Sequence, residues 1–177
     1  ENPWLLLYQT MIQPYSVGTE ILRSLEKAYE RFKQRKEIRG MFFSLARLIL
    51  VSIHSGVHSL PIVQLIKEAE ASLQLSELEK YPGERGMLLY SIGTGYILVE
   101  GDIRKGIIFC ENAALLFNQI KDSRLQINAE ALSAFGLVRV GEFSLAEETR
   151  QKIEKIVEKS VHSEIKAIQL MVECPLA

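Results

Sequence analysis

Three glycines stand 45 and 40 residues apart in this chain: Gly56, Gly101 and Gly141. Each is expected to break a helix, and glycine can do so in a left-handed conformation at little steric cost. The acidic residue after the second and third glycines is followed by small or compact side chains: Gly106, Cys110 and Ala113 in one copy, Ala146 in the other. This recurring pattern of glycines and small residues favours a repeated unit of two helices.

The fold class follows from the spacing of apolar residues, which recur every three or four positions almost everywhere. Sustained alternation is missing and the prolines fall at segment edges, so the chain is predicted to be all-α. No interdomain linker or low-complexity segment is visible, and one domain is expected over residues 1–177. Helices are expected over about 3–13, 19–32, 37–54, 61–73, 84–99, 103–117, 125–136, 143–157 and 163–173.

The repeat predicts how these helices are arranged. Each glycine is expected to divide a pair of helices, with a longer loop between one pair and the next. Such pairs cannot bury their apolar faces alone, so we expect an α-α superhelix of about four antiparallel hairpins. The small residues Gly106, Ala113 and Ala146 would let the second helix of a pair approach the first closely. The alternative is an ordinary helical bundle in which the glycines merely end helices.

The segment from Gly101 to Ala113 resembles the tetratricopeptide signature, in which a Gly-Asp turn precedes alanine, a large residue and a second alanine. Three features depart from it. The usual period is about 34 residues, Gly106 replaces the first alanine, and the copy after Gly141 has Ile153 in place of the last. The resemblance therefore implies a divergent repeat with longer loops.

Two further blocks are N2-P-W-L-L-L-Y8 and L25-E-K-A-Y-E-R-F32, followed by a helix that starts at I38-R-G-M41. They resemble the helical-repeat region of large bacterial signal-transduction ATPases and MalT-like, LuxR-type transcriptional regulators. In that family the repeats lie between a nucleotide-binding module and a DNA-binding helix-turn-helix. The resemblance implies an intracellular repeat segment that receives an effector or partner protein and passes the signal on.

Composition limits the other classes of function. A hydrophobic content of 47% excludes a disordered chain, and a net charge of −1 gives no general attraction to nucleic acid or anionic lipid. The sequence contains neither a P-loop nor a basic recognition helix, so DNA contact would need a helix-turn-helix outside this segment. Because the chain starts with Glu1 rather than methionine, it is expected to be part of a longer protein.

The expected location is the cytoplasm. Cys110 and Cys174 lie in apolar helical patterns without paired spacing, as reduced buried thiols would. The longest apolar run, residues 41–54, is interrupted by Arg47 and His54 and is too short to cross a bilayer comfortably. No membrane partner is expected.

No catalytic or cofactor site is predicted. His54 and His58 could begin a zinc site, but a polar helix terminus is the alternative and no third ligand is evident. The segment I92-G-T-G-Y96 lies in a helical pattern without a preceding strand, so close helix packing is favoured over phosphate binding. The glutamates show no acid–base pairing. We therefore expect no enzyme activity, no cofactor and no metal.

The aromatic residues fall on helical stripes, where core packing is the ordinary interpretation and exposed anchors on a groove are the alternative. They are Trp4, Tyr8, Phe32, Phe42, Phe109 and Phe117.

A binding groove for a protein, peptide or small effector is expected on the inner wall of the superhelix, formed by the first helix of each pair. Its predicted residues are Phe43, Arg47, His54, Ser91, Asn128, Phe135 and Arg139. Arg47 and Arg139 are candidates for contact with an anion or carboxylate, and the alternative is that both simply reach solvent. The competing function is a structural scaffold or oligomerisation module with no ligand.

Overall fold

The computed structural model describes residues 2–12, 18–56 and 62–159. In these ranges it is all-helical, as predicted, and contains no strand. The α-helices are α1 (Pro3–Ile12), α2 (Gly18–Gln34), α3 (Ile38–Ser55), α4 (Ile62–Ser72), α5 (Pro82–Gly95), α6 (Ile103–Gln119), α7 (Ser123–Arg139) and α8 (Phe143–Lys159). A short 3₁₀ helix, η2 (Ser76–Lys80), precedes α5, and a π-helical turn, η3 (Tyr96–Glu100), follows it. The helix predicted over 163–173 lies outside the described residues.

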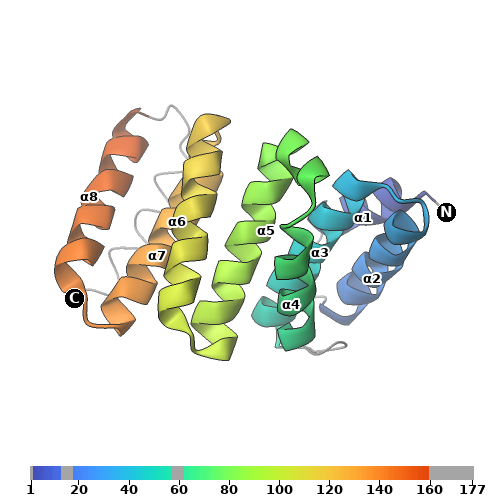
Figure 1. The fold of residues 1–177 in the computed structure, drawn as a ribbon, viewed down its shortest axis with the longest axis horizontal. Coiled ribbons are helices and arrows are strands. Elements are labelled where there is room, and N and C mark those ends of the chain that lie inside the picture. The colour runs from blue at the N-terminus through green and yellow to red at the C-terminus, as the bar shows by residue number, and fades with distance from the viewer. Residues whose placement is uncertain (1, 13–17, 57–61, 160–177) are drawn as a thin grey trace.

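The helices lie in a row, from α1 and α2 at one end to α8 at the other (Figure 1). Each helix packs against the next one along the chain, and α3 also packs directly against α5. The order of helices in space therefore follows their order in the sequence.

The core is divided along this row. The largest cluster joins α1 to α5 and includes Phe32, Phe42 and Leu78, all nearly or fully buried. Further clusters link α5, α6 and α7 around Phe117, and α7 and α8 around Ile153. Each cluster is formed by helices that neighbour one another in the chain, so the contacts that hold the fold are mostly local.

The three predicted helix-ending glycines do adopt left-handed backbone conformations, with φ of 64°, 80° and 79° at Gly56, Gly101 and Gly141. Two lysines that the sequence does not mark do the same, Lys36 at 54° and Lys121 at 59°. They end α2 and α6, where the next amide donates to a carbonyl five residues back: Glu37 to Phe32 and Asp122 to Phe117, each at 2.9 Å. This is the hydrogen bond of a left-handed helix ending.

The predicted loop pattern is wrong in two places. A long connection does separate α4 from α5, over residues 73–81, but α2 and α3 are joined by residues 35–37 alone, and α6 and α7 by residues 120–122 alone. Both turns are as short as the one at 140–142 between α7 and α8, because Lys36 and Lys121 take the left-handed conformation that Gly141 takes there. The helix predicted to start at about residue 84 begins two residues earlier, with Pro82 as its first residue, a position that proline suits.

The predicted close approach of α5 and α6 is confirmed at Gly93 and Gly106. A Cβ atom on Gly93 would lie 2.9 Å from the carbonyl oxygen of Gly106, and a Cβ on Gly106 would lie 2.9 Å from the carbonyl oxygen of Gly93. Side-chain Cβ atoms do not occur that close to a backbone oxygen. The two backbones therefore cross in contact, and the segment 92–96 is helical, as expected.

We predict that Gly93→Ala lowers the free energy of unfolding by about 1–3 kcal/mol, because the new methyl group must push α6 away from α5. Gly83→Ala is the matched control in the same helix. Its Cβ would meet only the end of Ile120 at 3.6 Å, an ordinary contact, so this variant should be as stable as the parent or slightly more stable. Urea denaturation checks both, and an equal loss in the two variants would contradict the close crossing.

Replacing Lys121 by glycine should stabilise the protein by about 0.5–1 kcal/mol, because it removes the steric cost of a side chain in a left-handed conformation. Lys155→Gly, an exposed position inside α8, serves as the control and should cost about 1 kcal/mol. The midpoint of urea unfolding reports both changes. A loss of stability in Lys121→Gly would argue against the described turn.

Candidate functional site

The predicted groove residues of α3 are mainly engaged within the fold. Phe43 is half-buried against the large core cluster. Arg47 donates from Nη2 to the carbonyl oxygen of Thr10 in the last turn of α1, at 3.2 Å. His54 donates from Nδ1 to the carbonyl oxygen of Leu50, at 2.7 Å, and its ring lies at the exposed end of the helix.

The predicted residues of α5 and α7 differ in their exposure. Ser91 is completely buried and its hydroxyl donates to the carbonyl oxygen of Leu88 at 2.8 Å, so it does not lie on an open surface. Asn128 is half-buried, and Phe135 is 40% exposed. Arg139 lies 5.8 Å from the centre of the Phe135 ring and donates from Nη1 to the carbonyl oxygen of Ile97 at 2.6 Å.

Arg47 and Arg139 share a structural role that the sequence did not reveal. Each donates to a carbonyl near the C-terminal end of a neighbouring helix, Arg47 to α1 and Arg139 to the turn η3 that ends α5. Such carbonyls lack a partner within their own helix and carry partial negative charge. Contact with an external anion stays a prediction for both arginines.

A different set of residues forms an open groove of about 570 Å³ beside the start of α3. We call it the N-terminal groove. None of the seven predicted groove residues belongs to it. It is lined by Trp4 and Tyr8 of α1, Lys36, Glu37, Ile38 and Arg39 around the start of α3, and Glu77, Lys80 and Tyr81 around η2.

Trp4 is the best-fixed side chain of the groove. Its ring lies edge-on against Phe32, with centroids 4.9 Å apart, and its Nε1 donates to the carboxylate of Glu37. The guanidinium of Arg39 lies 6.0 Å from the Trp4 ring and pairs with Glu84 at 2.5 Å. The indole thus has one side in the core and the other facing the groove.

The rim of the groove carries aromatic, cationic and anionic side chains rather than charges of one sign. Tyr8 is 57% exposed and stands 6.0 Å from Trp4, centroid to centroid. Lys36 and Lys80 are exposed, as is Glu77. The surface therefore offers aromatic rings together with both cationic and anionic groups, which suits contact with a polypeptide.

The aromatic stripes explain why sequence reasoning missed this site. Phe32, Phe42 and Phe117 are buried core residues, as predicted. For Tyr8 the core interpretation is wrong, and Trp4 is only half-buried. The signal available was the spacing of four between the two residues, which places them on one face of α1. Another part of the groove lining comes from residues in and beside η2, more than sixty residues away in the chain.

The described residues offer little for metal or thiol chemistry. No group of three His, Cys, Asp or Glu side chains among them could hold a metal ion, and His58 lies outside them. Burial, followed by the charge of Glu111, raises the pKa of the Cys110 thiol. A thiol in that state is a packing residue rather than a nucleophile.

Helix α3 meets the length and composition of a membrane span, alone among the described helices. However, 56% of it is buried inside the fold, and it contacts α1, α2, α4 and α5. The buried core helix of a soluble protein passes the same test of length and composition, so one such helix is weak evidence for a membrane span. A comparison with models of known protein families gives no match, and neither does a comparison with curated proteins.

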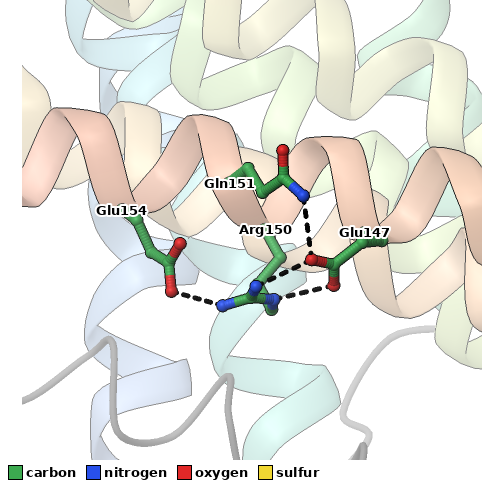
Figure 2. Close-up of polar contacts among 4 residues, drawn as sticks. All are labelled: Glu147, Arg150, Gln151 and Glu154. Carbon is green, nitrogen blue, oxygen red and sulfur yellow. Dashed lines mark hydrogen bonds and ion pairs between the residues drawn. The ribbon is translucent and has the colours of Figure 1, made fainter.

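The outer face of α8 carries a network of polar contacts (Figure 2). Arg150 donates to both carboxylate oxygens of Glu147, at 2.7 and 2.8 Å, and also to Glu154, while Gln151 donates to Glu147 at 3.0 Å. The hydrogen bonds from Arg150 and then Gln151 lower the pKa of Glu147 to about 2. Because the side chains of this network are partly or fully exposed, we regard it as a solvated surface of the last described helix.

Arg150→Gln should return the pKa of Glu147 from about 2 toward the ordinary value of a glutamate, because the charged donor is lost. Since the folded-state pKa is the lower one, any stabilisation by this pair is present above the ordinary pKa and disappears as the pH falls toward 2. NMR titration of the side-chain carboxyl carbons measures the shift. Lys155→Gln is the control on the same helix and should leave Glu147 unchanged.

Proposed function

We propose that this chain is a non-catalytic repeat domain of a bacterial transcriptional regulator that binds a protein or peptide partner, or senses a small effector. The observation that supports it best is the N-terminal groove. It presents Trp4, Tyr8, Tyr81 and Arg39, and tryptophan, tyrosine and arginine are the residues that contribute most to binding energy at protein interfaces.

The repeat architecture in this proposal is a tetratricopeptide-like superhelix of four antiparallel hairpins, α1 with α2 through α7 with α8. Two features of the fold support it. Neighbouring helices pack in chain order, and left-handed glycines end the first helix of the last three pairs. In such an array each hairpin is stabilised mainly by its neighbours.

The assignment to a regulator depends on the resemblance to MalT-like and LuxR-type proteins. The two sequence blocks that carry this resemblance contact each other, since Trp4 of the first packs on Phe32 of the second. They also line or support the N-terminal groove. Contact with DNA is assigned to a helix-turn-helix elsewhere in the parent protein, and the proposed location is the cytoplasm.

Signalling in this proposal is a shift between two packings of the hairpins. A partner that binds one packing more tightly shifts the population toward it, by no more than the difference in its two affinities. Hydrogen exchange on the intact parent protein, with and without the partner, measures this directly. Unchanged protection across α1 to α8 would contradict the coupling.

A scaffold without a ligand remains the second candidate. It is favoured by Ile108 and Leu115, each 57% exposed and seven residues apart, so that both lie on one face of α6. An apolar strip of this kind suits contact with a second copy. Sedimentation of the wild type and of Leu115→Ala separates the two functions, because only a scaffold would lose its oligomeric state in the variant.

For the leading function, we predict that peptides selected against the wild-type protein bind Tyr8→Ala about 10-fold more weakly, because an exposed aromatic contact of the groove is lost. Trp4, the single tryptophan of the chain, lines the groove and provides the fluorescence signal. Leu115→Ala removes an equally exposed apolar side chain elsewhere and should bind normally. Selected peptides that bind both variants equally would place the binding site outside the groove.

The gene that encodes the parent protein provides a separate test of the regulator assignment. An ATP-binding module before this segment and a helix-turn-helix after it would support the assignment. Neighbouring modules of another kind would overturn it and leave the groove proposal intact.

A further inference from the structure

The charged side chains of the N-terminal groove differ in how far they are already engaged within the fold. Three of the lining residues are basic, Lys36, Arg39 and Lys80, and two are acidic, Glu37 and Glu77. A group that is paired within the fold offers little to a partner, whereas an exposed and unpaired group can still form a charge-assisted hydrogen bond. The engagement of each group therefore decides which charge on a partner the groove favours.

The two lysines of the groove are unpaired. Lys36 lies in the turn between α2 and α3, and Lys80 is the last residue of η2, so they reach the groove from different elements. Both side chains are exposed, and neither ammonium group has an ion pair or a hydrogen bond within the part of the chain that the structure describes. Each is therefore available to a carboxylate of a bound chain.

The acidic groups of the groove are less available. The carboxylate of Glu37 is half-buried and accepts the hydrogen bond from Nε1 of Trp4. Glu77 is exposed, and its carboxylate accepts a long hydrogen bond, 3.5 Å, from the hydroxyl of its neighbour Ser76. Of the two carboxylates, only that of Glu77 is open to a partner.

Arg39 lies among the aromatic residues of the groove. Its guanidinium is 6.0 Å from the centre of the Trp4 ring, and its Nε donates to Glu84 at 2.5 Å. The hydrogen bond to Glu84 and then the charge of that carboxylate raise the pKa of Arg39, and Tyr8 and Tyr81 are near enough to contribute. The side chain is 60% exposed, and its two Nη groups have no partner among the described residues. They can therefore donate to a carboxylate placed beside the rings.

We propose that the N-terminal groove binds an acidic segment of a partner protein, an inference that rests on the peptide-binding function proposed above. A carboxylate side chain of the segment accepts hydrogen bonds from the Nη groups of Arg39, and further carboxylates pair with Lys36 and Lys80. Apolar side chains of the same segment pack on the rings of Trp4 and Tyr8. Charge complementarity then gives the specificity, and the aromatic contacts supply most of the affinity.

A polypeptide fits these residues better than a nucleic acid, although both can carry negative charge. The carboxylates of Glu37 and Glu77 would repel a continuous row of phosphates, which carries a charge on every nucleotide. A peptide can place its carboxylates at the basic residues and uncharged side chains elsewhere. The groove therefore favours separate carboxylates over an uninterrupted chain of charge.

Three blocked peptides test the class of partner on the full chain, with Trp4 fluorescence as the signal. They alternate leucine with glutamate, with glutamine or with lysine, and their ends are acetylated and amidated so that no terminal charge contributes. We expect the glutamate peptide to bind about 10-fold more tightly than the glutamine peptide and to lose affinity as salt is added, and the lysine peptide not to bind. Equal affinities of the glutamate and glutamine peptides, binding of the lysine peptide alone, or binding of none would overturn the proposal. So would tighter binding of a single-stranded oligothymidine than of the glutamate peptide.

Two arginine variants locate the site. Arg39→Gln removes the guanidinium of the groove and should weaken binding of the glutamate peptide about 10-fold. Arg104→Gln is the matched control, because Arg104 is also exposed and paired with a glutamate, Glu142, at 2.6 Å. It should leave the affinity unchanged, and the melting temperature of each variant checks that the fold is intact. Equal affinities in the two variants would contradict binding of the carboxylate at Arg39.

The peptides selected for the test of Tyr8→Ala separate this proposal from the function on which it rests. Selected peptides that bind Tyr8→Ala more weakly but contain no excess of acidic residues would overturn the acidic partner and leave the binding groove intact. Selected peptides that bind Tyr8→Ala and Arg39→Gln as tightly as the wild type would overturn both.

Discussion

The contact of two backbones at Gly93 and Gly106 is the constraint on which the second half of the structure depends. With no side chain on either residue, α5 and α6 approach until the carbonyl oxygen of one lies against the α-carbon of the other. Gly136 of α7 then packs against Ile107 and Ile97, so α7 is positioned by the same crossing. α8 follows through the cluster around Ile153. Each step fixes the next, which is how a row of helices keeps its order without long-range pairing.

The turns at the ends of the helices also determine how adjacent helices are arranged. The left-handed turns at Gly101, Lys121 and Gly141 reverse the chain within two or three residues, so that adjacent helices must run antiparallel. Arg47 and Arg139 also hold neighbouring helices together, since each donates a hydrogen bond to a carbonyl near the end of another helix. Buried backbone oxygens without such partners would be costly.

The sequence could predict the helices, because apolar periodicity and glycine punctuation are local signals. It could also predict the close approach at Gly106. It could not predict the left-handed turn at Lys121, because lysine carries no preference for that conformation. Ser91 was expected in a groove and is buried, while Tyr8 was expected in the core and is exposed. Exposure is decided by which other elements pack on a face, and the spacing of apolar residues within one helix does not show which elements those are.

The position of the N-terminal groove follows from an irregularity in helix length. α6, α7 and α8 each have 17 residues and lie against one another along their length. α4 has only 11 residues, and the chain then passes through η2 before α5 begins. In this part of the chain η2 and the residue after it, rather than a long helix, contribute Glu77, Lys80 and Tyr81 to one wall of the N-terminal groove. The groove therefore lies where the helices are least regular in length.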